Sequence, residues 1–169
     1  TDDQKTVFYT ALYHLLIHPN ILQDVNREYP AMESDKILTT KGDRYTVFSL
    51  WDTYRAEHPL LNLIKPRHGA DMAESMIRIQ QQSVLKLLPI WYLMANEAWC
   101  MSGYHAVSVL SDVAKKIGIK DKKAMLKAME ETANNKWVEG LSDYIKHGYV
   151  FYDRCGTSAS NTLEYAYDD

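Results

Sequence analysis

The sequence has no long apolar run and no excess of positive charge, and each absence excludes a class of protein. No stretch of about 18 consecutive apolar residues occurs, so the sequence predicts no membrane span. The 22 acidic residues outnumber the 19 lysines and arginines, which gives a formal net charge of -3. Such a chain lacks the basic footprint of a nucleic-acid-binding domain. We therefore expect neither a membrane span nor a nucleic-acid partner.

Cysteine is also scarce, because Cys100 and Cys155 are the only two. In a secreted protein they could form one disulfide, whereas two free, partly buried thiols are the simpler interpretation. The sequence also has no zinc-ligand spacing, Walker loop, dinucleotide-binding fingerprint or nucleophile elbow. Metal and nucleophile chemistry of these familiar kinds is therefore not expected.

Aromatic residues, by contrast, are plentiful. The chain has 169 residues, which suits one domain with its own core, and these include 12 tyrosines and four tryptophans. Tyrosine and tryptophan fill cores, but they also line wet clefts where one end of the ring packs and the other forms hydrogen bonds. The composition therefore predicts a globular domain and leaves room for a ligand cleft.

The spacing of apolar residues predicts roughly six or seven helices. Val7 to Leu16 repeat with helical spacing before Pro19, Asp121 is an N-cap, and Gly118 and Gly148 are helix stops. The other helices are expected over 48–58, 69–86, 101–117, 121–134, 137–147 and from Ser160 onward.

One segment has the character of strands. "DKILTTKGDRYTVF", residues 35–48, predicts a hairpin that turns at Lys41-Gly42-Asp43. Nothing indicates a parallel sheet. The expected fold class is therefore all-α, made of antiparallel helix pairs with one small β-hairpin.

The first candidate site is the segment "FSLWDTYRAEHPLL", residues 48–61. Pro59 should end or kink its helix at His58, and Trp51, Arg55 and His58 would share a helix face. One interpretation is an Asp52–Arg55 ion pair beside a core tryptophan. The other is a sugar site, in which the indole is an apolar platform and Asp52 and Arg55 bind hydroxyls. The pattern does not choose between them.

The second candidate is "WYLMANEAWCMSGYHA", residues 91–106, which we expect to be a buried loop leading into a helix. It places Asn96, Glu97 and His105 among aromatic residues, and binding residues often lie on such loops. Helix capping by Asn96 or Glu97 is the structural alternative. A lone histidine such as His105 is also often structural.

Four segments resemble glycoside hydrolase family 92. They are "VFYTALYHLLIHPNILQDVN", "YTVFSLWDTYRAEHPLLNLIKP", "NEAWCMSGYHAV" and "TLEYAYDD". They occur in the family's order and span essentially the whole chain. The family consists of calcium-dependent, inverting exo-α-mannosidases, found in bacteria that degrade glycoprotein glycans. The resemblance thus implies hydrolysis of terminal α-linked mannose, with α-1,2 linkages expected, and a secreted, periplasmic or cell-surface location.

The resemblance also implies the architecture. The family's catalytic domain is an (α/α)6 toroid preceded by a β-sandwich domain. Residues 1–169 are similar to the N-terminal part of the toroid, so we expect a fragment that is inactive alone. Its partners would be mannose-containing glycans, the rest of the catalytic domain and the β-sandwich domain.

The roles of individual residues follow from the same resemblance. The family's acid, its base and the calcium ligands correspond to sequence further toward the C-terminus, so we assign no catalytic residue and no metal ligand here. The matched segments form the wall of the mannose subsite. They make substrate-binding candidates of Trp51, Asp52, Arg55, Asn96, Glu97 and His105. Relatives carry "NETG" where this chain has Asn-Glu-Ala-Trp, and the tryptophan would reshape the pocket.

Two other functions fit the residues. The chain could be a non-catalytic all-α module that binds carbohydrate or a protein partner. It could also be a complete small glycosidase with Asp52 and Glu97 as the acid and base, although half a toroid would leave that site open to water.

Overall fold

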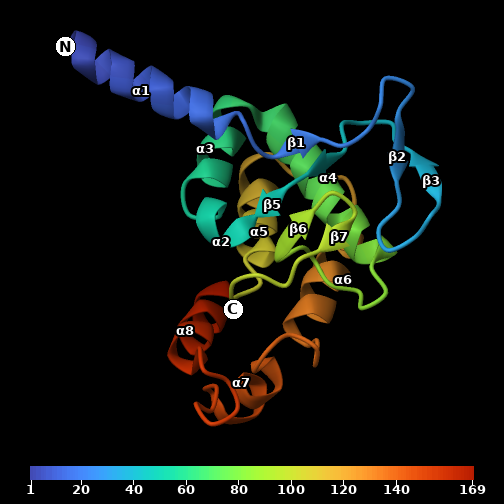
Figure 1. Cartoon of the computed structure of the whole chain (residues 1–169), viewed down its shortest axis with the longest axis vertical. Helices are drawn as coiled ribbons and strands as arrows, with labels where there is room; N and C mark the ends of the chain where they lie inside the picture. The colour runs from blue at the N-terminus through green and yellow to red at the C-terminus, as the bar shows by residue number, and fades with distance from the viewer.

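The computed structural model describes residues 1–169 as eight helices and seven short strands (Figure 1). The helices are α1 (Asp2–Leu15), α2 (Leu50–Thr53), α3 (Glu57–Ile64), α4 (Pro66–Gln82), α5 (Ala106–Lys116), α6 (Lys122–Ala133), α7 (Leu141–His147) and α8 (Ser158–Asp168). The strands are β1 (Asn20–Ile21), β2 (Glu28–Pro30), β3 (Ile37–Thr39), β4 (Tyr45–Thr46), β5 (Phe48–Ser49), β6 (Trp91–Leu93) and β7 (Asn96–Glu97). The mainly helical prediction is confirmed, and the short strands are more numerous than expected.

Several helix ends lie at the predicted capping residues. The Asp121 side chain accepts a hydrogen bond of 2.8 Å from the Ala124 backbone N–H, which caps α6. Gly148 ends α7 with a φ of 78°, and Gly118 follows α5 with a φ of 90°. Only glycine adopts this left-handed conformation at little cost. These boundaries follow from local sequence alone.

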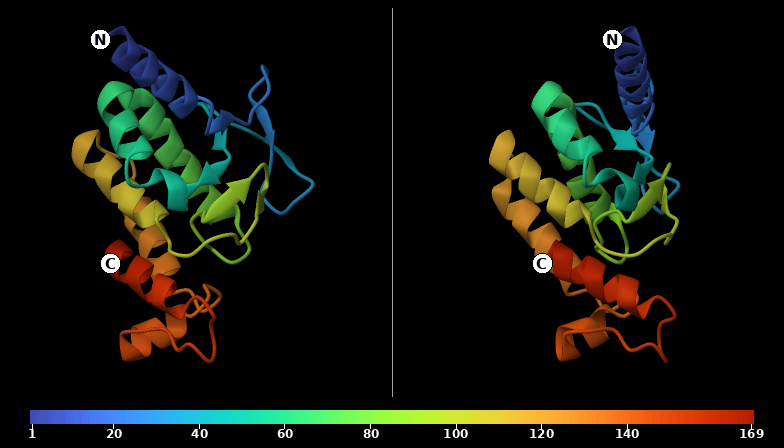
Figure 2. Two further views of the ribbon diagram at one scale, coloured as in Figure 1. Left: turned by 60° about the vertical axis from the view of Figure 1, so that its left-hand side comes forward. Right: turned by 90° about the vertical axis from the view of Figure 1, so that its left-hand side faces the viewer.

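Consecutive helices pack together in pairs. Contacts join α3 to α4, α5 to α6 and α7 to α8, and α3 and α4 also pack against α5 (Figure 2). A core of 26 buried hydrophobic residues, among them Met76 on α4, Leu110 on α5 and Tyr165 on α8, connects these pairs. The pairs agree with the predicted helical hairpins. Closure into a toroid stays a prediction.

The predicted hairpin over residues 35–48 is wrong. The two arms, β3 and β4, pair with strands that precede them: β3 with β2 and β4 with β1. Together with the sheet β5–β6–β7, they make three small antiparallel sheets instead of one hairpin. Strands of two or three residues carry too little pattern to specify a partner, so tertiary packing decided the pairing.

The helix predicted from Phe48 to His58 is also wrong. Phe48 pairs in β5, α2 covers only Leu50–Thr53, and a new helix starts at Glu57. Pro59 therefore lies in the first turn of α3, where its missing N–H removes no helical hydrogen bond. The proline lies within the first turn of the second helix and does not end the first.

Helix α1 projects from the body of the molecule (Figure 1). It is capped by Thr1 and Gln4, but none of its residues is buried. Phe8 and Tyr13 are 62% and 68% exposed.

No helix of the chain is both long and apolar enough to span a membrane. The two cysteines are free, with Cys100 exposed and Cys155 buried.

Candidate functional site

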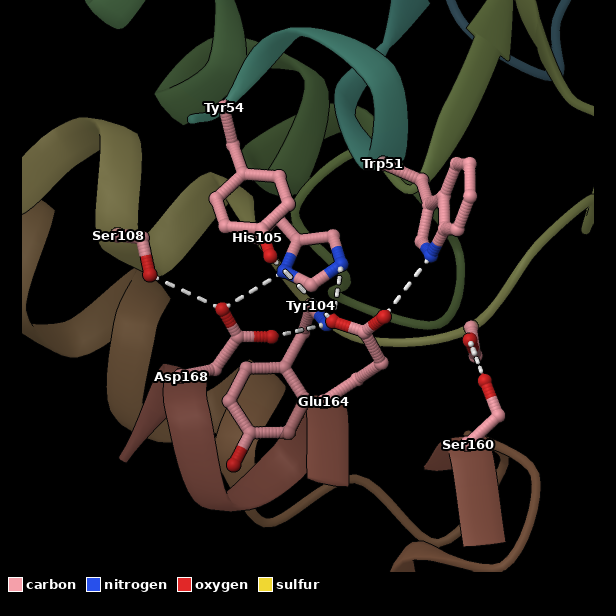
Figure 3. Close-up of polar contacts among 9 residues, drawn as sticks. Trp51, Tyr54, Tyr104, His105, Ser108, Ser160, Glu164 and Asp168 are labelled. Atoms are coloured by element: carbon pink, nitrogen blue, oxygen red, sulfur yellow. Dashed lines mark hydrogen bonds and ion pairs between the residues drawn. The ribbon is translucent and has the colours of Figure 1, made fainter. Parts of the chain in front are cut away.

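The indole of Trp51 is held by a carboxylate from the far end of the chain. Trp51 Nε1–H donates to Glu164 Oε1 at 3.0 Å, which links α2 to α8 (Figure 3). The Tyr54 hydroxyl donates to Glu164 Oε2 at 3.5 Å. Burial, and then the nearby Glu164 carboxylate, raise the pKa of the Tyr54 phenol, so it remains a donor at neutral pH. Trp51 itself is half-buried, which leaves part of the ring accessible.

His105 lies between two acidic side chains of α8. Its Nδ1 is 2.9 Å from Asp168 Oδ1, and its Nε2 is 3.4 Å from Glu164 Oε2. The second contact is not a hydrogen bond, so the buried Nε2 has no hydrogen-bond partner. The imidazole stacks on the Tyr54 ring with 3.9 Å between centroids and an interplanar angle of 5°. His105 is only 2% exposed, so a structural role fits it well.

Asp168 anchors this arrangement. Its fully buried carboxylate accepts from the Tyr104 backbone N–H at 2.7 Å and from the Ser108 hydroxyl at 3.0 Å, in addition to facing His105 (Figure 3). A buried carboxylate needs such a set of donors to offset its loss of hydration. We refer to Trp51, Tyr54, His105, Glu164 and Asp168 as the Glu164 cluster.

Arg55 lies at the exposed edge of the cluster. The Arg55 guanidinium carbon is 5.4 Å from the Trp51 ring centroid and 5.0 Å from that of Tyr54, within the range of cation–π attraction. No ion pair joins Arg55 to Asp52, so the pair considered from the sequence does not form. Asp52 is exposed. The guanidinium thus lies over the half-buried indole at the surface, whereas the Asp52 carboxylate is near enough to Glu57 to raise the pKa of that side chain.

Glu97 is occupied by backbone groups. Its carboxylate accepts from the N–H of Ile90 at 2.9 Å, Trp91 at 2.7 Å and Trp99 at 3.1 Å. Burial raises the pKa of Glu97, and these hydrogen bonds oppose the shift. The segment is not the loop expected from the sequence, because β6 and β7 pair as antiparallel strands and the Glu97 carboxylate stabilises them through these hydrogen bonds. An acid or base role for Glu97 would require breaking these bonds.

Asn96 and Trp99 are exposed beside Glu97. Asn96 pairs with Leu93 across the β6–β7 turn. Trp99 lines a cavity of about 130 Å³ with Trp137 and Tyr165, and none of the six candidate residues lines it. The sheet β5–β6–β7 places this turn two strands away from the start of α2.

The predicted face of Trp51, Arg55 and His58 is only partly formed. His58 belongs to α3, is 1% exposed, and lies with its ring centroid 6.4 Å from that of Phe48. Burial lowers its pKa to about 4. It is a neutral core histidine, because the break between α2 and α3 turns it inward.

The structure therefore brings Trp51, Arg55 and His105 together and leaves Asn96 and Glu97 on a separate turn. Sequence reasoning missed Glu164 and Asp168, and it did not make Tyr54 a binding candidate. The spacing of Glu164 and Asp168, four residues apart in the conspicuous segment "TLEYAYDD", was a usable signal, since it puts both carboxylates on one helix face. The exposed edge offers an apolar ring and the cationic donors of Arg55, which suits a hydroxylated ring.

Comparisons with known proteins show what the chain is similar to. The sequence profile of the glycosyl hydrolase family 92 catalytic domain matches residues 1–169. The chain is similar to the family GH92 α-mannosidase BT3965 from Bacteroides thetaiotaomicron, with 45% identity and a TM-score of 0.92 over 98% of this chain and 22% of that one. No curated protein sequence matches the chain.

Two further solved structures match. The same mannosidase in complex with mannoimidazole gives 46% identity and a TM-score of 0.90 over 95% of this chain and 21% of that one. The inverting mannosidase BT2199 from Bacteroides thetaiotaomicron VPI-5482 gives 32% identity and a TM-score of 0.86 over 99% and 24%. The chain thus spans less than a quarter of the length of these relatives.

Proposed function

The chain belongs to glycosyl hydrolase family 92, and from this membership we propose that it is part of an exo-acting α-mannosidase that hydrolyses terminal α-linked mannose from glycans. The observation that carries the proposal is the family match over residues 1–169. Two of its solved relatives are mannosidases, one of which binds mannoimidazole. We extend their substrate class to the protein that contains this chain.

The proposed reaction inverts the anomeric configuration, as BT2199 does. An inverting glycosidase uses a general acid and a general base that are about 6.5–9.5 Å apart, with room between them for the attacking water. Glu97 and Asp168 have their oxygens committed to donors of this chain. We therefore place the acid and base in the rest of the catalytic domain. Because the site would then be divided, we expect the isolated chain to be inactive.

The role that we propose for this chain is to bind the sugar. Trp51 supplies the apolar platform for the C–H face of mannose, and Arg55 at its edge and Asp52 bind hydroxyls. Asn96, which is exposed, is a further contact candidate. Glu97 and His105 support the wall without touching sugar, because the polar atoms of Glu97 are bonded to the protein and His105 is buried.

The family's calcium does not fit the residues of this chain. No group of three or more histidine, cysteine or acidic side chains is placed to hold a metal ion. Calcium prefers six to eight oxygen ligands, and the gathered carboxylates here already accept hydrogen bonds from protein donors. We propose that the calcium ligands belong to the rest of the catalytic domain, and we derive no step through the metal.

The finer features of the family complete the proposal. We propose α-1,2-linked mannose as the substrate, and a secreted, periplasmic or cell-surface location in a bacterium. We also propose that the helix pairs form part of an (α/α)6 toroid that follows a β-sandwich domain. Helix α1 projects from the body and has no buried residue, which supports the proposal that it packs against other parts of the longer protein.

The test uses the full-length protein that contains this segment. Release of mannose is measured from α-1,2-, α-1,3- and α-1,6-linked mannobiose, with calcium and with a chelator, and proton NMR identifies the first anomer released. We expect hydrolysis with inversion and loss of activity with chelator. Mannose binding without hydrolysis would instead establish a carbohydrate-binding module, and activity of the isolated chain would contradict the divided site.

Two variants examine the sugar platform. Trp51→Ala should raise KM by about tenfold or more, because each ~1.4 kcal/mol of lost binding is a factor of ten. Trp137→Ala is the matched control, since this tryptophan is 62% exposed and lies outside the Glu164 cluster. An unchanged KM in Trp51→Ala would exclude Trp51 from the sugar site.

A further inference from the structure

Glu164 is the point at which three side chains from two other helical segments meet. Its carboxylate accepts from Trp51 Nε1–H at 3.0 Å and from the Tyr54 hydroxyl at 3.5 Å, and lies 3.4 Å from His105 Nε2. Figure 3 shows the indole nitrogen pointing at this carboxylate. The side chain of Glu164 is 15% exposed. Both oxygens therefore face polar groups of the protein, and little of the carboxylate is open to a ligand.

We propose that Glu164 is a positioning residue, which acts on substrate through Trp51 by fixing the orientation of the indole. The inference rests on the proposed function, in which the exposed part of that ring binds sugar. A tryptophan side chain has three staggered wells about χ1 and a broad, roughly two-fold preference about χ2. The hydrogen bond from Nε1–H to Glu164 Oε1 selects one of these orientations. The platform is therefore in place before the sugar arrives.

Glu164 is itself held in place by a second set of contacts. His105 is clamped between Glu164 and Asp168, which lie one turn apart on α8, and its ring stacks face to face on Tyr54. Asp168 is fully buried and also accepts from Tyr104 N–H and the Ser108 hydroxyl of the α5 segment. These contacts fix α8 against α5 and α2. Glu164 therefore cannot turn toward solvent without losing several interactions at once.

Removal of the carboxylate has a consequence that can be estimated. Without an acceptor for Nε1–H, the indole can occupy the other orientations, and only a fraction of molecules present the platform. The apparent dissociation constant rises by the inverse of the competent fraction. If the three χ1 wells, or these combined with the two χ2 preferences, become equally populated, KM rises by about three- to sixfold. kcat should not change, because no group of the reaction is removed.

The experiment is a double-mutant cycle in the full-length protein that contains this segment, with KM and kcat measured on an α-mannoside. The variants are Glu164→Ala, Glu164→Gln, Trp51→Ala and the Trp51→Ala/Glu164→Ala pair. We expect Glu164→Ala to raise KM by about three- to sixfold at constant kcat. Glu164→Gln should stay near the wild type, since its amide oxygen still accepts from the indole. The double variant should match Trp51→Ala alone, because a residue that acts through Trp51 has nothing left to position.

Ser160→Ala is the matched control. Ser160 lies one turn before Glu164 on α8, and its hydroxyl is 3.3 Å from that of Ser102, so the change removes another tether of the same helix without touching Trp51 (Figure 3). We expect its KM to equal that of the wild type. The indole N–H resonance of Trp51, identified by its loss in Trp51→Ala, should shift in Glu164→Ala and stay in place in Ser160→Ala.

Several results would overturn the inference. They are an unchanged KM in Glu164→Ala, a loss confined to kcat, or an effect of Glu164→Ala that persists in the absence of Trp51. If Glu164→Ala does not fold, Trp51→Phe tests the bond from the other side, because phenylalanine keeps an aromatic face but has no N–H. An unchanged KM in Trp51→Phe would then refute the role of the bond. An unchanged KM in Trp51→Ala would instead refute the sugar platform itself, which separates the two failures.

Discussion

His58 makes the stability of the chain depend on pH in a defined window. It is buried beside Phe48, its Nε2 has no hydrogen-bond partner, and burial lowers its pKa from 6.5 to about 4. Above pH 6.5 the imidazole is neutral in both the folded and the unfolded chain, so it adds no pH dependence. As the pH falls below 6.5, the unfolded chain binds a proton that the folded chain refuses until about pH 4. Stability is therefore lost on the acid side.

The size of the loss follows from the same window. Each pH unit between the two pKa values costs about 1.4 kcal/mol. The window from pH 6.5 to about 4 then gives a loss of about 3 kcal/mol, of which most is reached near pH 4.5. This is a large share of the 5–15 kcal/mol that stabilises a typical domain. His58→Leu removes the titrating group and leaves no hydrogen bond broken at Nε2, so it should cost little at neutral pH.

Urea unfolding at about pH 7 and about pH 4.5 tests this reasoning. The free energy of unfolding of the wild type should fall between the two conditions by about 2.5 kcal/mol more than that of His58→Leu. His14→Leu is the control, because His14 is exposed on α1 and should retain the wild-type pH dependence. If His58→Leu loses as much stability as the wild type, proton uptake at His58 is not the cause.

Three further predictions concern other parts of the molecule. Glu97→Ala leaves three backbone N–H groups without their acceptor and should lower the free energy of unfolding by about 1–3 kcal/mol in thermal or urea unfolding, with a smaller loss in Glu97→Gln. Burial, and then the charge of Asp52, raise the pKa of Glu57 from 4.5 to about 7, so the free energy of unfolding should fall as the pH rises through that window. In Glu57→Gln the free energy of unfolding should fall less between about pH 5 and pH 8. The isolated chain should self-associate through exposed apolar faces such as that of α1, and light scattering that shows a monomer at all concentrations would contradict this.

Helix positions were predictable where the signal is local. Asp121 accepts from the N–H three residues ahead, and Gly118 and Gly148 act within a turn of the helices that they end. Such interactions lie within a few residues of sequence, so the sequence displays both partners together. Pro59 misled us because the same residue can follow one helix or open the next, and only packing decides which.

Strand pairing was not predictable for the opposite reason. Residues 37–39 and 45–46 look like the arms of one hairpin, yet each pairs with a strand that lies before the segment. Two- and three-residue strands have almost no alternation to match. Their partners are selected by the buried contacts of their side chains, such as those of Tyr29 and Tyr45, each 3–4% exposed.

In the candidate site too, contacts between neighbours in the sequence were predictable and contacts between distant residues were not. Trp51 and Arg55 are four residues apart and could be grouped from the sequence, whereas Glu164 is 113 residues from Trp51. An exposed Asp52–Arg55 pair would contribute only about 0.3–0.5 kcal/mol, so nothing strongly favours it. A half-buried indole N–H without an acceptor costs about 1–3 kcal/mol. The cost of an unpaired indole N–H exceeds the gain from the ion pair, so the hydrogen bond to the acceptor on α8 determines the geometry. Arg55 then lies over the rings of Trp51 and Tyr54. A tryptophan at the edge of a predicted site should therefore prompt a search for its acceptor among the carboxylates of distant helices, and "TLEYAYDD" contains the one that this structure uses.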